Sequence, residues 1–400
     1  MAFDLINETV ATAHIKVIGV GGAGGNAVTR MAESGQVVGC ELVAVNTDAQ
    51  DLDKCRASQK VLIGFKMTGG LGAGCKPEIG QAAAEESREA LESVLQGANM
   101  VFITAGMGGG TGTGATPIIA KMAKASGILT VAVVTKPFGF EGKRKMRLAL
   151  EGIEKLRQHV DSLIVIPNEK LRDMMETGFT VKDAFSRADE ILCNGVQSIF
   201  QLIKEPGYIN TDFADVCTVM QDAGLAHMAV GSGKGKEKAK KAIEAAINSP
   251  LLETTIDGAT GVIVHFRAGA DFDLGELYDA MSFIDDKVND DAIIISGYCT
   301  EEDAKDEVTV TVIATGFDAP DQPAPPPTTP TPQETTTKPV AEAGYTPIYG
   351  GEKLPATYVP PTESALETPI FPDQTQDEFD STEDRYRQIL SGFDEVPPIS

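Results

Sequence analysis

The chain has 400 residues, of which 42% are apolar and 23% are charged, and its formal net charge is −24. This length suffices for a large core and predicts two domains plus an unfolded part. Because the acidic excess leaves no basic patch, the composition argues against direct binding to nucleic acid and against electrostatic attachment to an anionic membrane.

The N-terminus and the cysteines indicate a cytoplasmic protein. The chain starts Met-Ala-Phe-Asp-Leu-Ile-Asn-Glu, which is acidic where a secretory signal is basic, and no apolar run is long enough for membrane insertion. The six cysteines are scattered, with neither a Cys-x-x-Cys pair nor a histidine at metal-ligand spacing. We therefore expect reduced thiols and no metal site built from side chains.

From residue 13 to residue 179, short apolar strands alternate with helical stretches. The expected strands are His14–Val20, Leu42–Val45, Val101–Ala105, Ile128–Val134 and Ser162–Ile166. Such alternation is typical of a Rossmann-like parallel sheet, and nearly continuous apolar runs fit strands that are buried on both sides. After a flexible N-terminus, 1–12, we expect this α/β domain to occupy residues 13–179.

Two glycine-rich loops follow strands of this sheet. The first reads Ile18-Gly-Val-Gly-Gly-Ala-Gly-Gly-Asn26, and the second reads Gly106-Met-Gly-Gly-Gly-Thr-Gly-Thr-Gly114. Each lies between two apolar segments, whereas a flexible linker is polar on both flanks. Because glycine lacks a Cβ atom, several consecutive N–H groups can face one phosphate, and the following helix adds the positive end of its dipole. The sequence therefore predicts two phosphate-binding loops at the carboxyl edge of the sheet.

The residues alone leave the class of nucleotide open. Gly19-x-Gly21-x-x-Gly24, with Asp48 after the next strand, satisfies the dinucleotide fingerprint of NAD(P)-dependent oxidoreductases. The pattern Gly-x-x-x-x-Gly-Lys-Ser/Thr does not occur, which argues against the P-loop nucleotidases. An oxidoreductase therefore stays an alternative at this point.

Beyond residue 179 the expected helices and strands no longer alternate regularly. A long helix is expected over Val181–Lys204, with Thr180 as N-cap and Asp183 three residues on, within a central segment 180–208. Residues 209–317 group their strands late, which is typical of an α+β domain. The expected elements there are helices Lys236–Ile247 and Leu274–Val288 and strands Gly261–Arg267, Ala292–Tyr298 and Val308–Ala314.

The last part of the chain has a different composition. Residues 318–400 hold 16 of the 22 prolines and 15 acidic against 4 basic residues, which predicts a disordered, proline-rich acidic linker over 318–380. In the final peptide, 381–400, Ile389, Leu390 and Phe393 could form a short helix on a partner, or the peptide could be an inert end.

Three motifs carry a resemblance to a known family. Gly108-Gly-Gly-Thr-Gly-Thr-Gly114 matches the tubulin signature, and with Ile18–Ala27 and Asn210-Thr-Asp-Phe-Ala-Asp-Val216 it resembles the FtsZ family of tubulin-like cell-division GTPases over about residues 13–317. The resemblance implies hydrolysis of GTP to GDP and phosphate with magnesium, and head-to-tail polymerisation into the filaments of the cytokinetic Z ring at mid-cell. A non-catalytic GTP-binding scaffold stays a second alternative.

The resemblance also implies a nucleotide site. The glycine loops would hold the phosphates, the loop Gly70–Gly74 would sense the terminal phosphate, and Glu141 would meet the ribose. Phe185 would pack on the guanine, whose N–H groups the Asp189 carboxylate can accept. The full implied set is Gly21, Gly22, Ala23, Gly24, Gly25, Asn26, Asn46, Asp48, Gly72, Ala73, Gly74, Gly106, Gly108, Gly109, Gly110, Thr111, Gly112, Thr113, Glu141, Lys145, Asn168, Phe185 and Asp189.

Asp212 and Asp215 have two interpretations. Spaced i, i+3 at the start of a helix, they suit helix capping and the helix dipole, which is the simpler explanation from spacing alone. The resemblance implies instead that they form a catalytic loop with Asn210, which completes the nucleotide site of the next molecule in a filament. There the two aspartates would polarise and position the attacking water.

Three places depart from the family pattern. Lys145 stands where arginine is usual, with Arg144 beside it, and Cys75-Lys76 stands where small or amide side chains are usual. The C-terminal peptide also differs from the family peptide that binds membrane-tethering division proteins of the FtsA or ZipA type. We expect such a tether as a partner, and the sequence leaves its identity open.

Overall fold

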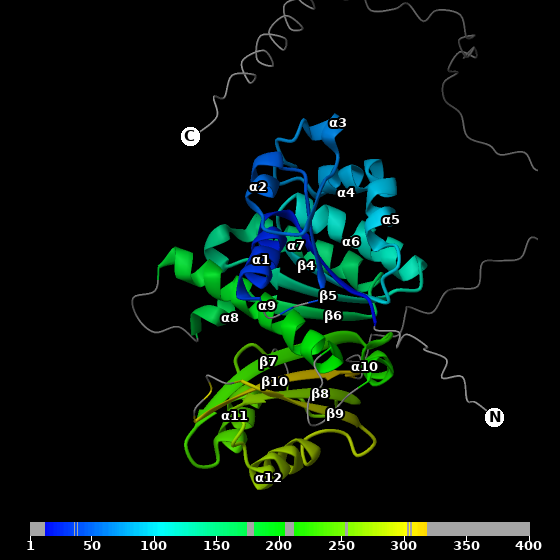
Figure 1. Ribbon diagram of the computed structural model, residues 1–400. Helices are drawn as coiled ribbons and strands as arrows, with labels where there is room; N and C mark the ends of the chain where they lie inside the picture. Colours follow the sequence, from blue (N-terminus) through cyan, green and yellow to red (C-terminus); the bar gives the residue numbers. More distant parts are fainter. Residues whose placement is uncertain are drawn as a thin grey trace, which may run out of the picture. The chain divides into compact units, whose positions relative to one another are not determined.

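The computed structural model describes residues 13–317 apart from 36, 38, 174–179, 205–211, 253–254, 302–303 and 305 (Figure 1). The expectations for residues 1–12, for Asn210 and for the segments 318–380 and 381–400 lie outside the described residues. All described residues belong to one compact unit of the chain.

The N-terminal half builds a parallel sheet in the order β3-β2-β1-β4-β5-β6. Its strands are β1 (Ile15–Val20), β2 (Glu41–Asn46), β3 (Gln59–Leu62), β4 (Met100–Gly106), β5 (Leu129–Lys136) and β6 (Ser162–Pro167). The five expected strands are present, with ends within two residues of those expected, and the Rossmann-like fold class is confirmed. The pattern misses β3 because it is a four-residue edge strand in which Gln59 and Lys60 are exposed.

The sheet continues into the second half of the chain. β7 (Gly224–Lys234) pairs in parallel with β6 and antiparallel with β10 (Glu307–Thr315), and β8 (Gly261–Ala268) and β9 (Ile293–Thr300) follow, which gives one ten-stranded sheet. β7 was not expected, because glycines interrupt its apolar pattern. A Cβ atom at Gly231 or Gly233 would collide with the backbone of α11 (Lys238–Ile247), so this close helix–strand contact requires glycine there.

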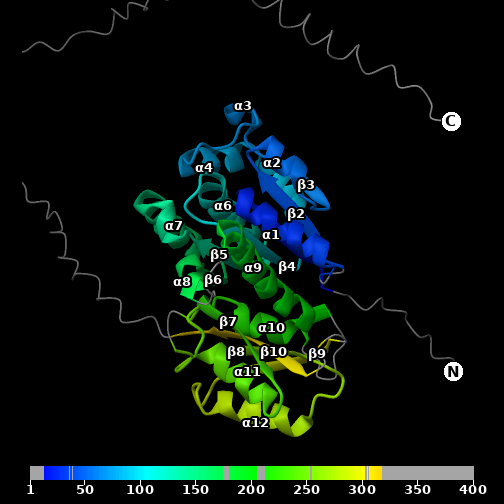
Figure 2. The same cartoon turned by 90° about the vertical axis from the view of Figure 1, so that its left-hand side faces the viewer.

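Helices cover both faces of the parallel sheet (Figures 1 and 2). One face packs against α1 (Gly21–Ser34), α9 (Val181–Lys204) and α10 (Phe213–Met220). The other face packs against α4 (Pro77–Glu86), α5 (Arg88–Leu95), α6 (Thr111–Ala125) and α7 (Lys143–Arg157). In the second half, α11 and α12 (Leu274–Asp285) cover the remaining core. The short helices are α2 (Ala49–Lys54), α3 (Phe65–Thr68), η1 (Gly139–Glu141) and α8 (Asn168–Asp173).

The central helix α9 has the bounds that the sequence predicts. Its start is a capping box, since the Asp183 N–H donates to Thr180 Oγ1 at 3.2 Å and the Thr180 N–H donates to Asp183 Oδ2 at 3.0 Å. Its buried face contacts strands of both halves of the sheet, and the Ser198 hydroxyl donates to Thr311 of β10 at 3.0 Å. The helix therefore joins the two halves.

The direction of the strands gives the parallel sheet two distinct edges. At the carboxyl edge, β1 leads directly into α1, and β4 leads through the second glycine loop into α6. At the amino edge lies the C-terminal end of α10, where the hydroxyl of Ser162, the first residue of β6, donates to the Met220 carbonyl at 2.6 Å. The two edges lie at opposite ends of the strands.

Over the residues that the structure describes, no helix combines the length and the apolar character needed to cross a membrane.

Candidate functional site

A cavity of about 250 Å³ lies at the carboxyl edge of the parallel sheet, where both glycine loops end. It is lined by Val20, Gly21, Gly22, Ala23, Gly106, Met107, Gly109, Gly110, Thr111, Gly112, Thr135, Pro137, Glu141, Lys145, Asn168, Phe185, Ala188 and Asp189. The cavity therefore gathers both loops, the end of β5 and the loop after it, the start of α8 and the first half of α9.

Two helices open onto this cavity with their first turns uncapped. The N-cap of α1 is Val20 and that of α6 is Gly110, and neither position supplies a side-chain cap. The first N–H groups of both helices thus lack the partner that a capping side chain would give, and both positive dipole ends lie beside the same space. Two converging sets of N–H donors suit a chain of phosphates better than a single anion.

The second glycine loop is shaped by contacts behind the cavity. Gly108 has a φ of +103°, and a Cβ atom there would lie 2.7 Å from the Lys145 carbonyl oxygen, so glycine is required. The Gly108 N–H donates to Thr113 Oγ1 at 2.8 Å. Gly108 and Thr113 therefore support the loop and do not line the cavity. The hydroxyls of Thr111 and Thr47 lie 2.6 Å apart and join α6 to the loop after β2.

Some residues expected in the nucleotide site lie beside the cavity rather than in it. Gly24 packs against the carbonyl of Thr104 in β4, where a Cβ atom would collide. Asp48 is the N-cap of α2 and accepts the N–H groups of residues 50 and 51. Gly25, Asn26 and Asn46 line a second cavity of about 120 Å³, which shares Gly21 and Gly22 with the first.

The loop expected to sense the terminal phosphate packs on the second glycine loop. A Cβ atom at Gly110 would lie 2.7 Å from Cβ of Ala73, which is buried. The Gly72 N–H donates to the Thr47 carbonyl at 3.1 Å, and Gly74 has a φ of +58°. None of the three lines the cavity, so in this structure the loop supports the second glycine loop from outside.

Two polar side chains, Asn168 and Asp189, also line the cavity. Asn168 is only 4% exposed, and its Oδ1 atom has no hydrogen-bond partner within the described part of the chain. Burial raises the pKa of Asp189 to about 6, although Arg30 opposes the shift. A half-buried carboxylate and an unpaired amide oxygen favour a ligand that donates N–H or O–H groups.

Phe185 offers an apolar face beside these polar groups. Its side chain is 40% exposed, and its ring stands edge-on to those of Phe138 and Phe140, at centroid distances of 5.3 and 6.2 Å. The neighbouring rings hold Phe185 in place while leaving a surface on which a planar base can pack.

Glu141 and Lys145 form an ion pair on the cavity wall. Lys145 Nζ lies 3.0 Å from Glu141 Oε2, and Glu141 Oε1 accepts the Phe138 N–H at 2.9 Å. Arg144 is exposed and does not line the cavity. Lys145, and not its neighbour Arg144, is therefore the basic residue of this segment that lines the cavity.

Asp212 and Asp215 lie apart from this cavity and do not line it. Both are exposed at the start of α10, and the Asp215 N–H donates to Asp212 Oδ1 at 2.8 Å. The capping geometry predicted from their spacing is therefore present. Because α10 is bound to the amino edge of the sheet, the two aspartates do not belong to the cavity of their own subunit.

Two family models match the chain. The model described as "Tubulin/FtsZ family, GTPase domain" matches residues 14–176, and the FtsZ C-terminal domain model matches residues 224–318. The cell division proteins FtsZ of Pseudomonas aeruginosa and Pseudomonas putida are each 50% identical over 318 residues, which cover 79% of this chain and 80% of theirs. The chain belongs to the FtsZ family. It is therefore a GTPase that polymerises in cell division, and it binds GTP and GDP.

Solved structures agree with this assignment. An empty FtsZ dimer from M. jannaschii is 46% identical, with a TM-score of 0.74, over 76% of this chain and 88% of that chain. A GTPγS-bound protofilament of CetZ2 from Haloferax volcanii, 21% identical with a TM-score of 0.65 over 76% of this chain and 93% of that chain, shares the fold. FtsZ membership leaves the oxidoreductase and the non-catalytic scaffold without support.

The sequence motifs of the FtsZ family do not reveal every residue of the cavity. The motif-based set omits Val20, Met107, Thr135, Pro137 and Ala188. Val20, Met107 and Ala188 are chain neighbours of expected residues, and that adjacency was an available signal. Thr135 pairs with Gly106 in the sheet register, so only the order of the strands brings it to the site.

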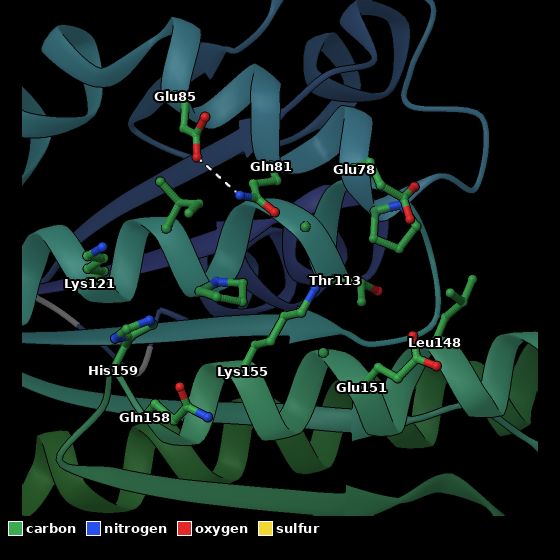
Figure 3. Close-up of a pocket in the computed structure, with 15 residues that line it drawn as sticks. Glu78, Gln81, Glu85, Thr113, Lys121, Leu148, Glu151, Lys155, Gln158 and His159 are labelled. Atoms are coloured by element: carbon green, nitrogen blue, oxygen red, sulfur yellow. Dashed lines mark hydrogen bonds between the residues drawn. The ribbon is translucent and has the colours of Figure 1, made fainter. Parts of the chain in front are cut away.

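A larger cavity of about 410 Å³ lies elsewhere, between α4, α6 and α7 (Figure 3). It includes Lys121, Lys155 and His159 together with three glutamates, but Thr113 is the one residue it shares with the expected site. The N-caps of α1 and α6, Val20 and Gly110, do not line it, and neither do the first two residues of α6, Thr111 and Gly112. The uncapped helix starts therefore favour the smaller cavity as the candidate nucleotide site.

Proposed function

We propose that GTP bound in the cavity of one subunit is hydrolysed where a second subunit contributes Asp212 and Asp215. The observation that carries this proposal is that the cavity lies at the carboxyl edge of the parallel sheet, whereas α10, which begins at the two aspartates, is bound to its amino edge. We call the cavity and the two aspartates the two half-sites. A rigid subunit cannot bring its own α10 to its own cavity, whereas head-to-tail contact brings the amino edge of one subunit to the carboxyl edge of the next. The filaments so formed would make the Z ring at mid-cell in the cytoplasm.

Exposed apolar side chains support a contact between subunits near the cavity. Phe65, Met67 and Leu71 are 61%, 53% and 82% exposed, on α3 and on the loop that packs against Gly110. Apolar groups gathered on one exposed region favour a protein partner. Burial of this surface in a filament would remove water from the mouth of the cavity.

The catalytic chemistry follows from the two half-sites. The N–H groups of α1 and α6 would hold and neutralise the phosphates, and Lys145 would add a positive charge. Asp212 and Asp215 of the next subunit would orient the attacking water in line with the terminal phosphate, with Asn210 assisting. Because the aspartates arrive only on assembly, hydrolysis would follow polymerisation and would then weaken it.

Magnesium fits the acidic residues beside the phosphate-binding loops. No cluster of three or more His, Cys, Asp or Glu side chains suited to a metal occurs among the described residues. Mg²⁺ typically binds through one or two carboxylates plus the substrate phosphates. Asp51 lies next to Gly22 of the first glycine loop, and Asp48 lies next to Gly72. When bound, Mg²⁺ would supply charge neutralisation at the phosphates.

The partner of the C-terminal peptide 381–400 is the remaining part of the proposal. Its apolar residues Ile389, Leu390 and Phe393 favour docking on a membrane-tethering division protein of the FtsA or ZipA type.

The test is GTP hydrolysis per molecule as the protein concentration rises. A site shared between subunits predicts turnover close to zero below a threshold and a sharp rise to a plateau above it, in step with light scattering by filaments. A rate per molecule that is constant at all concentrations would show that one subunit hydrolyses GTP alone. Assembly without phosphate release would instead mark a non-catalytic scaffold.

A further inference from the structure

Lys124 lies in the last turn of α6, at the end opposite to the phosphate-binding loop. The helix has 15 residues and spans about 22 Å, so it runs from the carboxyl edge of the sheet to the amino edge. There Lys124 Nζ contacts Asp222 Oδ1 at 2.7 Å, Asp161 Oδ1 at 3.1 Å and the Val160 carbonyl at 3.2 Å. These contacts join α6 to the chain segments that precede β6 and β7.

Asp161 is the fixed partner of this lysine. Its side chain is buried, and its Oδ2 atom accepts the Thr130 N–H at 2.8 Å. Its backbone carbonyl accepts the N–H of Gly224, the first residue of β7, at 2.9 Å. Asp161 therefore belongs to the rigid amino edge of the sheet.

Asp222 is the exposed partner in this contact. It follows the last residue of α10 by two positions, its side chain is largely exposed, and its φ is +50°, which few side chains adopt. Although burial opposes the shift, the two carboxylates raise the pKa of Lys124, and Lys124 lowers the pKa of Asp222. The pair is thus held in its charged form at the exit of α10.

The position of α10 decides where the proposed catalytic aspartates stand. The helix has eight residues, so Asp212 lies about 12 Å from the anchored end, and a small tilt there moves its carboxylate by an ångström or more. A misplacement of about 1 Å can lower the rate of an oriented reaction about 100-fold. The anchors of α10 therefore bear directly on the rate of hydrolysis.

We propose that Lys124 is a positioning residue for GTP hydrolysis. By binding Asp161 and Asp222 together it fixes the end of α10 to the parallel sheet, and so sets where Asp212 and Asp215 face the next subunit. This role rests on the proposed function, because it matters for the rate only if α10 completes the cavity of a neighbour. It also links the two half-sites of one subunit through a single helix, α6.

The experiment compares Lys124→Met with Lys121→Met. Lys121 lies one turn earlier on α6, is exposed beside the cleft in Figure 3, and has no ion pair among the described residues. We expect Lys124→Met to lower kcat roughly 10-fold with an unchanged KM for GTP, and Lys121→Met to match the wild type. Lys124→Arg, which can bind both carboxylates, should restore most of the rate.

A second variant, Asp222→Asn, tests the same contact from its exposed side, so that the test does not depend on the folding of Lys124→Met. Asp222→Asn keeps the left-handed backbone conformation available and removes one exposed charge, so the fold should survive while kcat falls. In a double-mutant cycle, Lys124→Met with Asp222→Asn should be no slower than Lys124→Met alone, because both act through one contact.

The outcomes separate this role from the proposed function itself. Wild-type turnover without a concentration threshold would overturn the shared site. A threshold in the wild type together with a normal kcat for Lys124→Met and Asp222→Asn would overturn the role of Lys124 alone. A loss of GTP affinity in Lys124→Met, or an equal loss of kcat in Lys121→Met, would also contradict it.

Discussion

Asp212→Asn lowers the rate of GTP hydrolysis about 100-fold or more and leaves the affinity for GTP unchanged. The expected loss is the usual contribution of a residue that orients or deprotonates a nucleophile. Asparagine can still accept the Asp215 N–H, so the cap of α10 is kept and only the charge is removed. Hydrolysis is followed by phosphate release, and binding by titration with a fluorescent GTP analogue.

The matched control is Asp273→Asn. Asp273 caps α12 in the same manner, accepting the N–H groups of Gly275 and Glu276 at 2.8 and 3.3 Å, but it is not part of the proposed site. We expect normal turnover from this variant. Equal turnover in Asp212→Asn and the wild type would leave Asp212 with its capping role alone.

Asp189→Asn lowers the affinity for GTP about 100-fold. A carboxylate can accept both N–H groups of the guanine edge, whereas an amide offers one acceptor and turns a donor toward the base, and hydrogen bonds to charged groups contribute about 1.5–3 kcal/mol each. The control is Glu190→Gln. Glu190 is the next residue on α9, and its carboxylate forms an ion pair with Arg187 at 2.8 Å and does not line the cavity. Calorimetric titration with GTP that finds equal affinities would remove Asp189 from the site.

The same substitution should stabilise the nucleotide-free protein. Burial raises the pKa of Asp189 to about 6, above its ordinary value of 3.8. The neutral form is therefore favoured in the fold, and this contribution to stability is present below pH 4 and is lost as the pH rises through 6. At pH 7 we expect Asp189→Asn to raise the free energy of unfolding by about 1–2 kcal/mol, a figure reduced for the partial exposure of the side chain. Near pH 4 we expect the variant and the wild type to have the same free energy of unfolding. GTP binding by the wild type should weaken below pH 6.

The local patterns that the sequence predicts well are those with short-range causes. α9 has its expected bounds because the Thr180–Asp183 box and the spacing of its apolar residues act within the helix. The two glycine loops are recognisable because close backbone approach after a strand needs consecutive glycines. The capping contact between Asp212 and Asp215 is also local.

The parts that the sequence hides depend on contacts between distant segments. Thr135 enters the cavity only because β5 lies beside β4, and the order of strands is not written in either strand. The sequence pattern misses β7 because its glycines, which allow α11 to pack closely, interrupt the apolar run. On α9, Asp189 would be taken for a solvated position, and only the burial around it raises its pKa. The contacts within one chain do not reveal a site that a second subunit completes.

The most direct test of the shared site is to mix two variants that are inactive for opposite reasons. Asp212→Asn keeps its nucleotide cavity, and Asp189→Asn keeps its aspartates. At a GTP concentration that fills only the unaltered cavities, random head-to-tail copolymers should pair an intact cavity with intact aspartates at about one contact in four. The equal mixture should therefore recover about a quarter of the wild-type turnover. A mixture as inactive as either variant alone would contradict the account.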